Sequence, residues 1–213
     1  MNNLSRPELR NRMRAQRQRL SEVERLAVAQ RVADIAGHSA LFLRSRHIAF
    51  YLSNDGEVSL APLMQRAWAM GKICYLPVIL SAKRLRFAPY APGEPLRPNQ
   101  FGIPEPARTR LHVLDARLLD LVLLPLVAFD TRGNRLGMGG GYYDRSLSFL
   151  RLRHHWRKPR LLGIAYECQR VARLEAKSWD VPLDGIATES RLYLAAATSH
   201  HDADPRVEPR IPP

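Results

Sequence analysis

One apolar segment in the middle of the chain constrains the fold more than any other feature. The run Leu119 to Leu124 offers apolar side chains to both faces of a strand, which is typical of a strand buried on two sides in a parallel sheet. Helical patterns alternate with the other strand-like segments, as parallel sheets require. We therefore predict an α/β fold, a Rossmann-like three-layer α/β/α sandwich around a largely parallel (mixed) central sheet, with N-terminal helices. The other predicted strands are 47–52, 73–78, 84–89, 161–165, 184–188 and 192–194.

The N-terminal segment 5–36 predicts two capped helices. Ser5 is a suitable N-cap, with Pro7 and Glu8 in the first turn, where both residue types are favoured. The sequence Ser21-Glu22-Val23-Glu24 is a capping box that begins a second helix, and Gly37 is a suitable stop for it. A third helix is predicted over 58–70, ended by Gly71.

Four arginines of the first predicted helix share one face, because they are spaced at i, i+4, i+8 and i+11. One interpretation is an ordinary amphipathic helix whose charged face lies in water. The other is a basic face directed at phosphate groups, for which the guanidinium fork is well suited. The sequence leaves both open. The four residues are Arg6, Arg10, Arg14 and Arg17.

The composition favours anionic partners and argues against a membrane protein. The net charge of +13 is compatible with phosphorylated cofactors or nucleic acid. No run of about 18 apolar residues occurs, and the N-terminus lacks the apolar core of a signal peptide. We expect a cytoplasmic protein in which Cys74 and Cys168, each in apolar surroundings, are buried free thiols.

A glycine-rich segment, Arg135–Arg145, is the strongest candidate for a binding site. Its sequence, RLGMGGGYYDR, lets a backbone approach a ligand closely and point amide groups at an anion. A helix predicted over 142–150 would add its positive end at the same place. The segment is neither a Walker A loop nor a dinucleotide fingerprint. We interpret it as a phosphate site, the alternative being a flexible surface loop.

Two further segments are predicted to lack regular structure. Residues 91–110 are rich in proline and glycine, which predicts an irregular connection. Residues 198–213 are polar and proline-rich, which predicts a disordered tail. The predicted organisation is therefore one α/β domain over 1–197 and a tail over 198–213.

Taken together, these segments resemble the 5-formyltetrahydrofolate cyclo-ligase family, also called methenyltetrahydrofolate synthetase. The resemblance rests on the glycine-rich segment and covers about 6–189, nearly the whole chain. It implies an enzyme that uses ATP and Mg²⁺ to convert 5-formyltetrahydrofolate into 5,10-methenyltetrahydrofolate, ADP and phosphate. The supporting motifs are LPLVAFD at 124–130, FGIPEP at 101–106, YLS at 51–53, GEV at 56–58, GIAY at 163–166 and DVPLD at 180–184.

The resemblance also implies roles for individual residues. It places ATP at two segments, the first being Arg6, Pro7, Glu8, Leu9 and Arg10, and the second Arg135, Leu136, Gly137, Met138, Gly139, Gly140, Gly141, Tyr142 and Tyr143. It places the folate at Leu52, Glu57, Met138, Gly139, Gly140, Gly141 and Tyr142. It assigns Mg²⁺ to Asp144 and Asp180, and catalysis to Arg135, Tyr142 and Asp144.

Some of these roles have simpler alternatives. The family usually has lysine where Arg6 stands, so that contact changes from an ammonium to a planar fork. Glu57 could be a surface acid or helix cap instead of a pterin ligand. Asp144 could simply complement the dipole of the helix that follows the glycines.

Two other functions compete with the cyclo-ligase reading. A sugar-phosphate isomerase-like enzyme would bind phosphate on a similar α/β scaffold without ATP. A basic RNA-binding protein would use the net charge of +13 and the arginine face of the first helix. We expect a folate as small-molecule partner, no nucleic acid, no membrane contact and a monomer.

Overall fold

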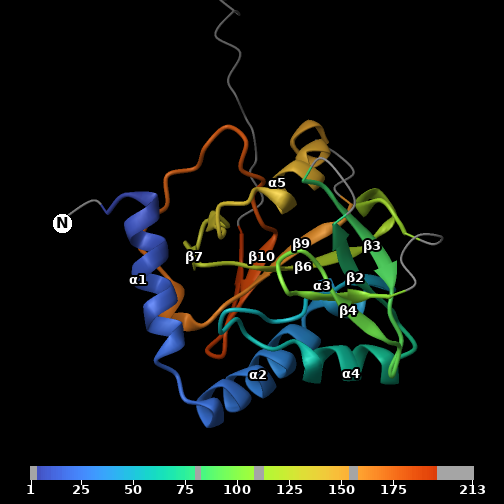
Figure 1. Cartoon of the computed structure of the whole chain (residues 1–213). Helices are drawn as coiled ribbons and strands as arrows, with labels where there is room; N and C mark the ends of the chain where they lie inside the picture. Colours follow the sequence, from blue (N-terminus) through green and yellow to red (C-terminus); the bar gives the residue numbers. More distant parts are fainter. Residues whose placement is uncertain (1–3, 80–82, 108–112, 154–157, 196–213) are drawn as a thin grey trace, which may run out of the picture.

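The computed structural model describes residues 4–79, 83–107, 113–153 and 158–195. Its centre is a seven-stranded sheet in the order β11-β10-β9-β6-β1-β2-β3 (Figure 1). The strands of this sheet are β1 (His47–Ala49), β2 (Ile73–Ile79), β3 (Leu85–Pro89), β6 (Leu121–Pro125), β9 (Arg160–Ile164), β10 (Gly185–Ala187) and β11 (Leu192–Leu194).

The sheet is mixed but mostly parallel, as predicted. The five inner strands pair in parallel, from β10 through β9, β6 and β1 to β2. The two edge strands, β3 and β11, are antiparallel to their neighbours. The apolar run at the centre is β6, in which Leu121 and Leu123 pack on one face and Val122 and Leu124 on the other. Burial on both faces explains its lack of alternation.

Helices cover both faces of the sheet. The helices α2 (Glu22–Gly37), α3 (Ala40–Leu43) and α4 (Ala61–Ala69) pack on one face. The other face is covered by the short α5 (Tyr142–Ser146) and the 3-10 segment η2 (Ser148–Leu152). The predicted three-layer architecture is confirmed. Among the described residues, none of the helices has the length and apolar character that a membrane span requires.

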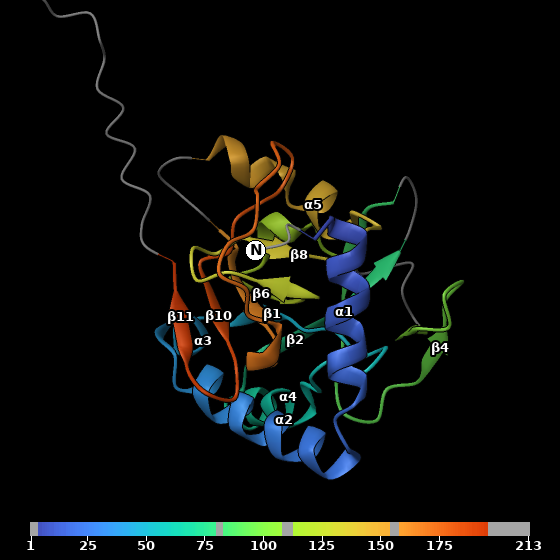
Figure 2. The ribbon, with the colours of Figure 1, turned by 90° about the vertical axis from the view of Figure 1, so that its left-hand side faces the viewer.

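The first helix, α1 (Arg6–Gln18), is separate from these layers. In Figure 2 it stands upright beside the sheet, above the α2 layer. It packs against β7 (Ala128–Phe129) and the 3-10 turn η3 (Glu167–Gln169). The predicted capping box of Ser21 with Glu24 is present, and the predicted N-cap Ser5 also forms a capping box, with Glu8. They satisfy backbone amides that would otherwise lack partners.

Two predicted helices are shorter than expected. The helix predicted from residue 58 begins at Ala61, because the ring of Pro62 would clash with the Val58 carbonyl if the helix began there. The helix predicted over 142–150 ends at Ser146. The chain then changes to a 3-10 turn that buries Leu147 and Leu150.

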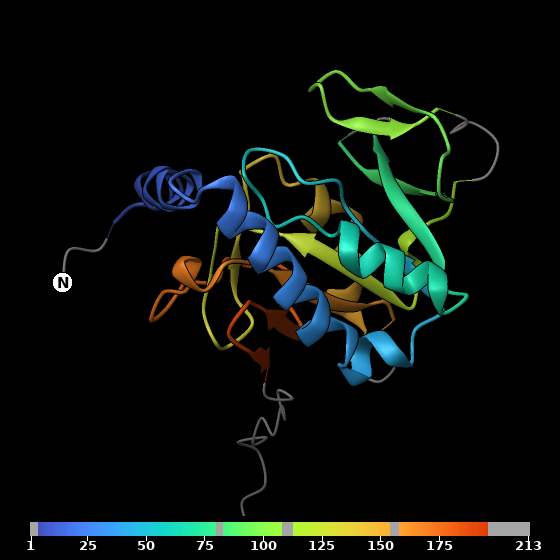
Figure 3. The same ribbon diagram turned by 90° about the horizontal axis from the view of Figure 1, so that it is seen from below.

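Two other predictions were wrong. The segment 91–110 is not wholly irregular, because it contains the hairpin of β4 (Leu96–Pro98) and β5 (Pro104–Pro106), which projects from one side of the molecule in Figure 3. Its turn is shaped by Asn99, whose side-chain oxygen accepts the amides of Phe101 and Ile103. Cys74 is buried as expected, but Cys168 is exposed on η3. The predicted tail lies outside the described residues.

The burial of β6 predicts that truncating one of its side chains destabilises the fold. Leu123 is completely buried, so Leu123→Ala should lower the free energy of unfolding by about 2–5 kcal/mol through lost burial and a residual cavity. Urea denaturation would measure it. The control is Leu152→Ala, at a leucine that is 82% exposed, where a change within about 0.5 kcal/mol is expected. Equal effects at both positions would contradict the assignment of β6 as a core strand.

Candidate active site

The main cavity lies at the carboxyl ends of β1 and β6, and has a volume of about 840 Å³. From β1 the chain continues to β2 on one side, whereas β6 lies on the other side of β1. Such a switch point leaves an open crevice because the connections leave in opposite directions. The loop after β1, the glycine loop and the start of α1 all line it. The predicted loops therefore meet in one site.

The glycine loop follows a small hairpin of β7 and β8 (Arg135–Leu136). Gly139 and Gly141 have φ angles of 103° and 67°, which side-chain-bearing residues rarely adopt. A Cβ on Gly140 would lie 2.9 Å from the Tyr142 ring. Glycine is therefore required at these three positions, where a side chain would be strained or would clash.

An ion pair between Arg135 and Asp144 joins the two ends of the glycine loop. Arg135 is 8% exposed and donates to the Asp144 carboxylate and to the Val181 carbonyl. Burial lowers the pKa of Arg135, and the charges of Asp144 and Asp180 oppose that shift. Asp144 lies in the first turn of α5, so its carboxylate also complements the dipole of that helix, which was the simpler role considered for it. The arginine thus forms part of the cavity wall, with its charge compensated.

Asp180 is held in a similar way on the same wall. Its Oδ2 accepts from Arg6 Nη2 at 2.7 Å and from the Lys177 amide at 2.9 Å. The other carboxylate oxygens, Asp144 Oδ2 and Asp180 Oδ1, accept no hydrogen bond from any described residue. Two hard oxygen donors next to the predicted phosphate site fit Mg²⁺, which commonly takes one or two carboxylates and fills its shell with phosphate and water. Among the described residues no cluster of three or more metal-ligating side chains occurs.

The arginine face of α1 turns toward the cavity and the loop after β1, so it is not an ordinary charged face that lies in water. Arg6 and Arg10 line the cavity, and Arg10 Nε donates to the Gly137 carbonyl at 2.8 Å. Arg14 and Arg17 bind Asp55 in the loop after β1. The three predicted ATP residues between Arg6 and Arg10 do not line the cavity. Pro7 is at the start of the helix, Glu8 belongs to the capping box, and Leu9 packs on a small apolar cluster around Met13.

Glu57 occupies the opposite side of the cavity. Its Oε2 accepts the Asn54 amide at 3.2 Å. Burial, together with the charge of Glu57, raises the pKa of Tyr51 and of Tyr143. Burial raises the pKa of Glu57 to about 7, partly opposed by the Asn54 hydrogen bond and by the Arg17 charge, while Asp55 adds to the shift. The helix-cap alternative is wrong, because α4 begins only at Ala61. Leu52 lines the same side.

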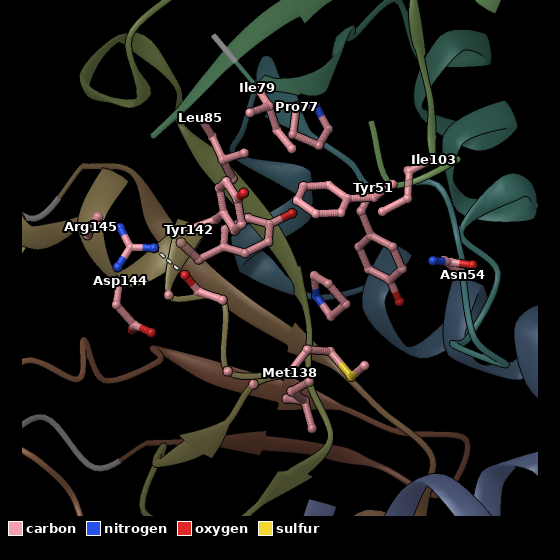
Figure 4. Close-up of a pocket in the computed structure, with 18 of the residues that line it drawn as sticks. Tyr51, Asn54, Pro77, Ile79, Leu85, Ile103, Met138, Tyr142, Asp144 and Arg145 are labelled. Carbon is pink, nitrogen blue, oxygen red and sulfur yellow. Dashed lines mark hydrogen bonds between the residues drawn. The ribbon is translucent and has the colours of Figure 1, made fainter. Parts of the chain in front are cut away.

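Aromatic and basic side chains complete the cavity (Figure 4). Tyr142 lies in the middle, between Tyr51 and Ile103 on one side and Asp144 and Arg145 on the other. Its ring meets Phe101 edge-on, with 6.0 Å between centroids. Arg145 donates to the Gly140 carbonyl and lies 5.8 Å from the Tyr142 ring.

Sequence reasoning missed several residues that line this cavity. Phe101 and Ile103 lie in the segment predicted as irregular, although their motif contributed to the family resemblance. Asp55 was assigned only to a turn. Asp55 has a positive φ of 51°. Its arginine partners are distant in the sequence, so its role depends on tertiary contacts. Others include Tyr51, Asn54, Arg84, Arg151 and Trp179.

Comparison with known proteins agrees with the earlier resemblance. The profile of the 5-formyltetrahydrofolate cyclo-ligase family matches residues 2–189. The chain is 40% identical over 190 residues to the 5-formyltetrahydrofolate cyclo-ligase of Haemophilus influenzae, covering 87% of this chain and 98% of the relative. It is 42% identical over 148 residues to the Escherichia coli cyclo-ligase, covering 68% and 79%.

Solved structures agree with the sequence comparison. The fold is similar to that of Aquifex aeolicus 5,10-methenyltetrahydrofolate synthetase, with a TM-score of 0.77, 30% identity, and coverage of 94% of this chain and 100% of the other. It is also similar to the Mycoplasma pneumoniae synthetase, with a TM-score of 0.67, 25% identity, and coverage of 87% and 99%. On the sequence match along nearly its whole described length, this chain belongs to the 5-formyltetrahydrofolate cyclo-ligase family.

Proposed function

We propose that this protein converts 5-formyltetrahydrofolate to 5,10-methenyltetrahydrofolate at the expense of ATP, with Mg²⁺ as cofactor. The observation that carries the proposal is the shared cavity, which is lined both by the arginine-supported glycine loop and by the partly buried Glu57. One side is suited to phosphate and the other to a heterocycle with N–H donors. We retain a cytoplasmic monomer as a prediction.

The phosphate side combines flexible cations with open backbone. Arg6 and Arg10 reach the cavity from α1, and a Cβ built on Gly137 meets no protein atom within 4 Å. A phosphate chain could lie against this open backbone with the guanidinium groups beside it. We assign ATP to this side, where Leu136, Met138 and Tyr143 also line the cavity.

The folate side presents Glu57 among apolar and aromatic side chains. The ionised form of Glu57 would accept hydrogen bonds from the pterin N–H groups. Leu52, Met138 and Tyr142 would contact the flat parts of the ligand. Gly139, Gly140 and Gly141 lie between the two sides, so they are suited to the place where the formyl group meets the terminal phosphate.

The reaction needs positioning and charge stabilisation more than a protein nucleophile. The formyl oxygen attacks the terminal phosphorus of ATP, and ADP leaves. The N10 nitrogen of the folate then attacks the formyl carbon, and the former formyl oxygen departs as phosphate. Arg135 would hold Asp144 in place, and Tyr142 would line the reacting centre. Bound Mg²⁺ would neutralise phosphate charge, held by Asp144 and Asp180.

Of the two competing functions, the RNA-binding role loses its main support. It would use the arginine face of α1, but Arg6 and Arg10 line the cavity and Arg14 and Arg17 are paired with Asp55. A sugar-phosphate isomerase-like reaction would use an acid such as Glu57 as general base, so the family match, and not the cavity, favours the cyclo-ligase reaction over it. Nucleotide dependence separates this last alternative from our proposal.

The first experiment is a direct assay. Purified protein with 5-formyltetrahydrofolate, Mg²⁺ and ATP should show a rise in the near-ultraviolet absorbance of the methenyl product that is absent without ATP.

Asp144→Asn should raise the Mg²⁺ concentration for half-maximal turnover by about 10- to 100-fold, because it removes a carboxylate ligand. Asp184→Asn is the control, since Asp184 pairs with Arg160 outside the cavity. An unchanged Mg²⁺ requirement would remove Asp144 from the metal site.

The glycine loop provides a second test. In Gly137→Ala the new methyl group meets no protein atom within 4 Å, and the backbone is outside the left-handed region. We therefore expect an unchanged melting temperature. If ATP lies against the loop, the KM for ATP should rise by about tenfold, or roughly 1.4 kcal/mol. An unaltered KM would show that the nucleotide does not approach this glycine.

The raised pKa of Glu57 predicts a pH dependence. Its folded-state pKa of about 7 means that the carboxyl group is neutral below that pH and ionised above it. Folate affinity should therefore increase from about pH 6 to about pH 8 and be lost as the pH falls. Glu57→Gln should weaken binding by about tenfold or more and remove this component of the pH dependence. Isothermal calorimetry would measure both.

Glu175→Gln is the matched control for that experiment, because the Glu175 side chain is 82% exposed and lies outside the cavity lining. It should reproduce the pH profile of the unmodified protein. If Glu57→Gln also reproduces it, the pterin contact assigned to Glu57 is wrong.

A further inference from the structure

Asp55 is held by side chains from the C-terminal half of α1. Arg14 donates to its carboxylate through Nε at 2.7 Å and Nη2 at 3.1 Å, Arg17 through Nη2 at 2.5 Å, and Gln18 through Nε2 at 2.8 Å. Arg17 Nε also donates to the Asp55 carbonyl at 2.8 Å. We refer to Arg14, Arg17 and Asp55 as the loop clamp. It joins residues 38 and 41 positions apart in the sequence.

The loop clamp differs from an ordinary surface ion pair. The Arg17 side chain is 0% exposed, and a buried charge requires a partner because its hydration is lost. The hydrogen bond from Arg14, with that from Arg17 and both positive charges, lowers the pKa of Asp55 to about 2 against the opposing effect of burial. The carboxylate therefore stays ionised, and the loop is attached to the helix.

The same loop carries Glu57 into the cavity. Asp55 and Gly56 form its tip, with φ angles of 51° and 74°. The turn is closed by the Glu57 amide, which donates to the Asn54 carbonyl at 3.0 Å, and by the Asn54 amide, which donates to Glu57 Oε2 at 3.2 Å. A movement of Asp55 therefore moves the carboxyl group of Glu57.

The N-terminal half of α1 meets the other side of the cavity. Arg6 binds Asp180, and Arg10 binds the carbonyl of Gly137. A continuous helix from residue 6 to residue 17 spans about 16 Å as a rigid rod. The N-terminal half of α1 thus contacts the glycine loop at Gly137, and the C-terminal half holds the Glu57 loop through Asp55 and also reaches the glycine loop, with Arg17 Nη2 4.0 Å from Met138 Sδ.

We propose that the loop clamp positions Glu57 and couples the two ligand sites, so that nucleotide bound at Arg6 and Arg10 tightens folate binding through α1. Arg14 and Arg17 lie outside the cavity lining, whereas Asp55 lines the cavity beside Glu57; in this mechanism all three act as positioning residues that hold the loop. The inference rests on the proposed function, since it takes ATP at the glycine loop and folate at Glu57. The coupling is reciprocal, so folate tightens nucleotide binding by the same factor.

Asp55→Asn tests the clamp with little change of shape. Asparagine keeps the size of the side chain and tolerates a positive φ, but it removes the charge that Arg14 and Arg17 require. The dissociation constant of 5-formyltetrahydrofolate would be measured with and without ADP, which lacks the terminal phosphate and so limits direct contact between ligands. For the unmodified protein we expect ADP to tighten folate binding on the order of tenfold.

In Asp55→Asn that tightening should be lost, while the dissociation constant of ADP alone stays unchanged. Asp115→Asn is the matched control, because Asp115 is also held by two arginines, Arg86 and Arg117, and lies outside the cavity lining. It should keep the full coupling. Arg14→Gln is a second variant, expected to fold because the Arg14 side chain is 38% exposed, and it should reduce the coupling as well.

The outcomes separate the inference from the proposed function. No ATP-dependent turnover by the unmodified protein would overturn the proposed function. Turnover with no effect of ADP on folate affinity would overturn the coupling alone. Retained coupling in folded Asp55→Asn, or in Arg14→Gln if Asp55→Asn does not fold, would show that the ion pair has only a structural role. Loss of coupling in these variants and its retention in Asp115→Asn would support the clamp.

Discussion

The parallel pairing of β1 with β6 is the constraint on which the site depends. The chain passes from β1 to β2 on one side and reaches β6 on the other side only after the β4–β5 hairpin. The loops leaving the carboxyl ends of β1 and β6 therefore diverge and leave an opening between them. The Glu57 loop follows β1, and the glycine loop follows β6. Both sides of the proposed reaction are thus set by the order of the strands.

The second requirement is charge compensation in a strongly basic chain. Two arginines are almost entirely buried, Arg17 and Arg135, and each has an aspartate partner, Asp55 and Asp144. Breaking a buried pair is costly because the remaining charge has no solvent. These pairs hold the two loops that border the cavity. The net charge of +13 therefore does not describe the site, where cations are matched by acids at defined positions.

The regular elements could largely be predicted from local rules. Capping boxes at Ser5 and Ser21 locate the starts of α1 and α2, because the side chains that satisfy terminal amides are adjacent in sequence. The buried strand β6 follows from its apolar composition. The errors occurred where local preference was overridden. Pro62 moves the start of α4, burial of Leu147 and Leu150 ends α5 early, and Asn99 shapes a hairpin inside a segment expected to be irregular.

The sequence by itself determined the chemistry available to this protein: a glycine loop that only glycine can form, flanking arginines and acids, and a pattern specific enough to indicate the family. The tertiary structure decided which of these groups meet. It paired Arg14 and Arg17 with Asp55, turned the arginine face of α1 inward and raised the pKa of Glu57 to about 7 by burial. The sequence alone does not show these effects. Desolvation and ion pairs between distant residues exist only once distant segments of the chain are packed together.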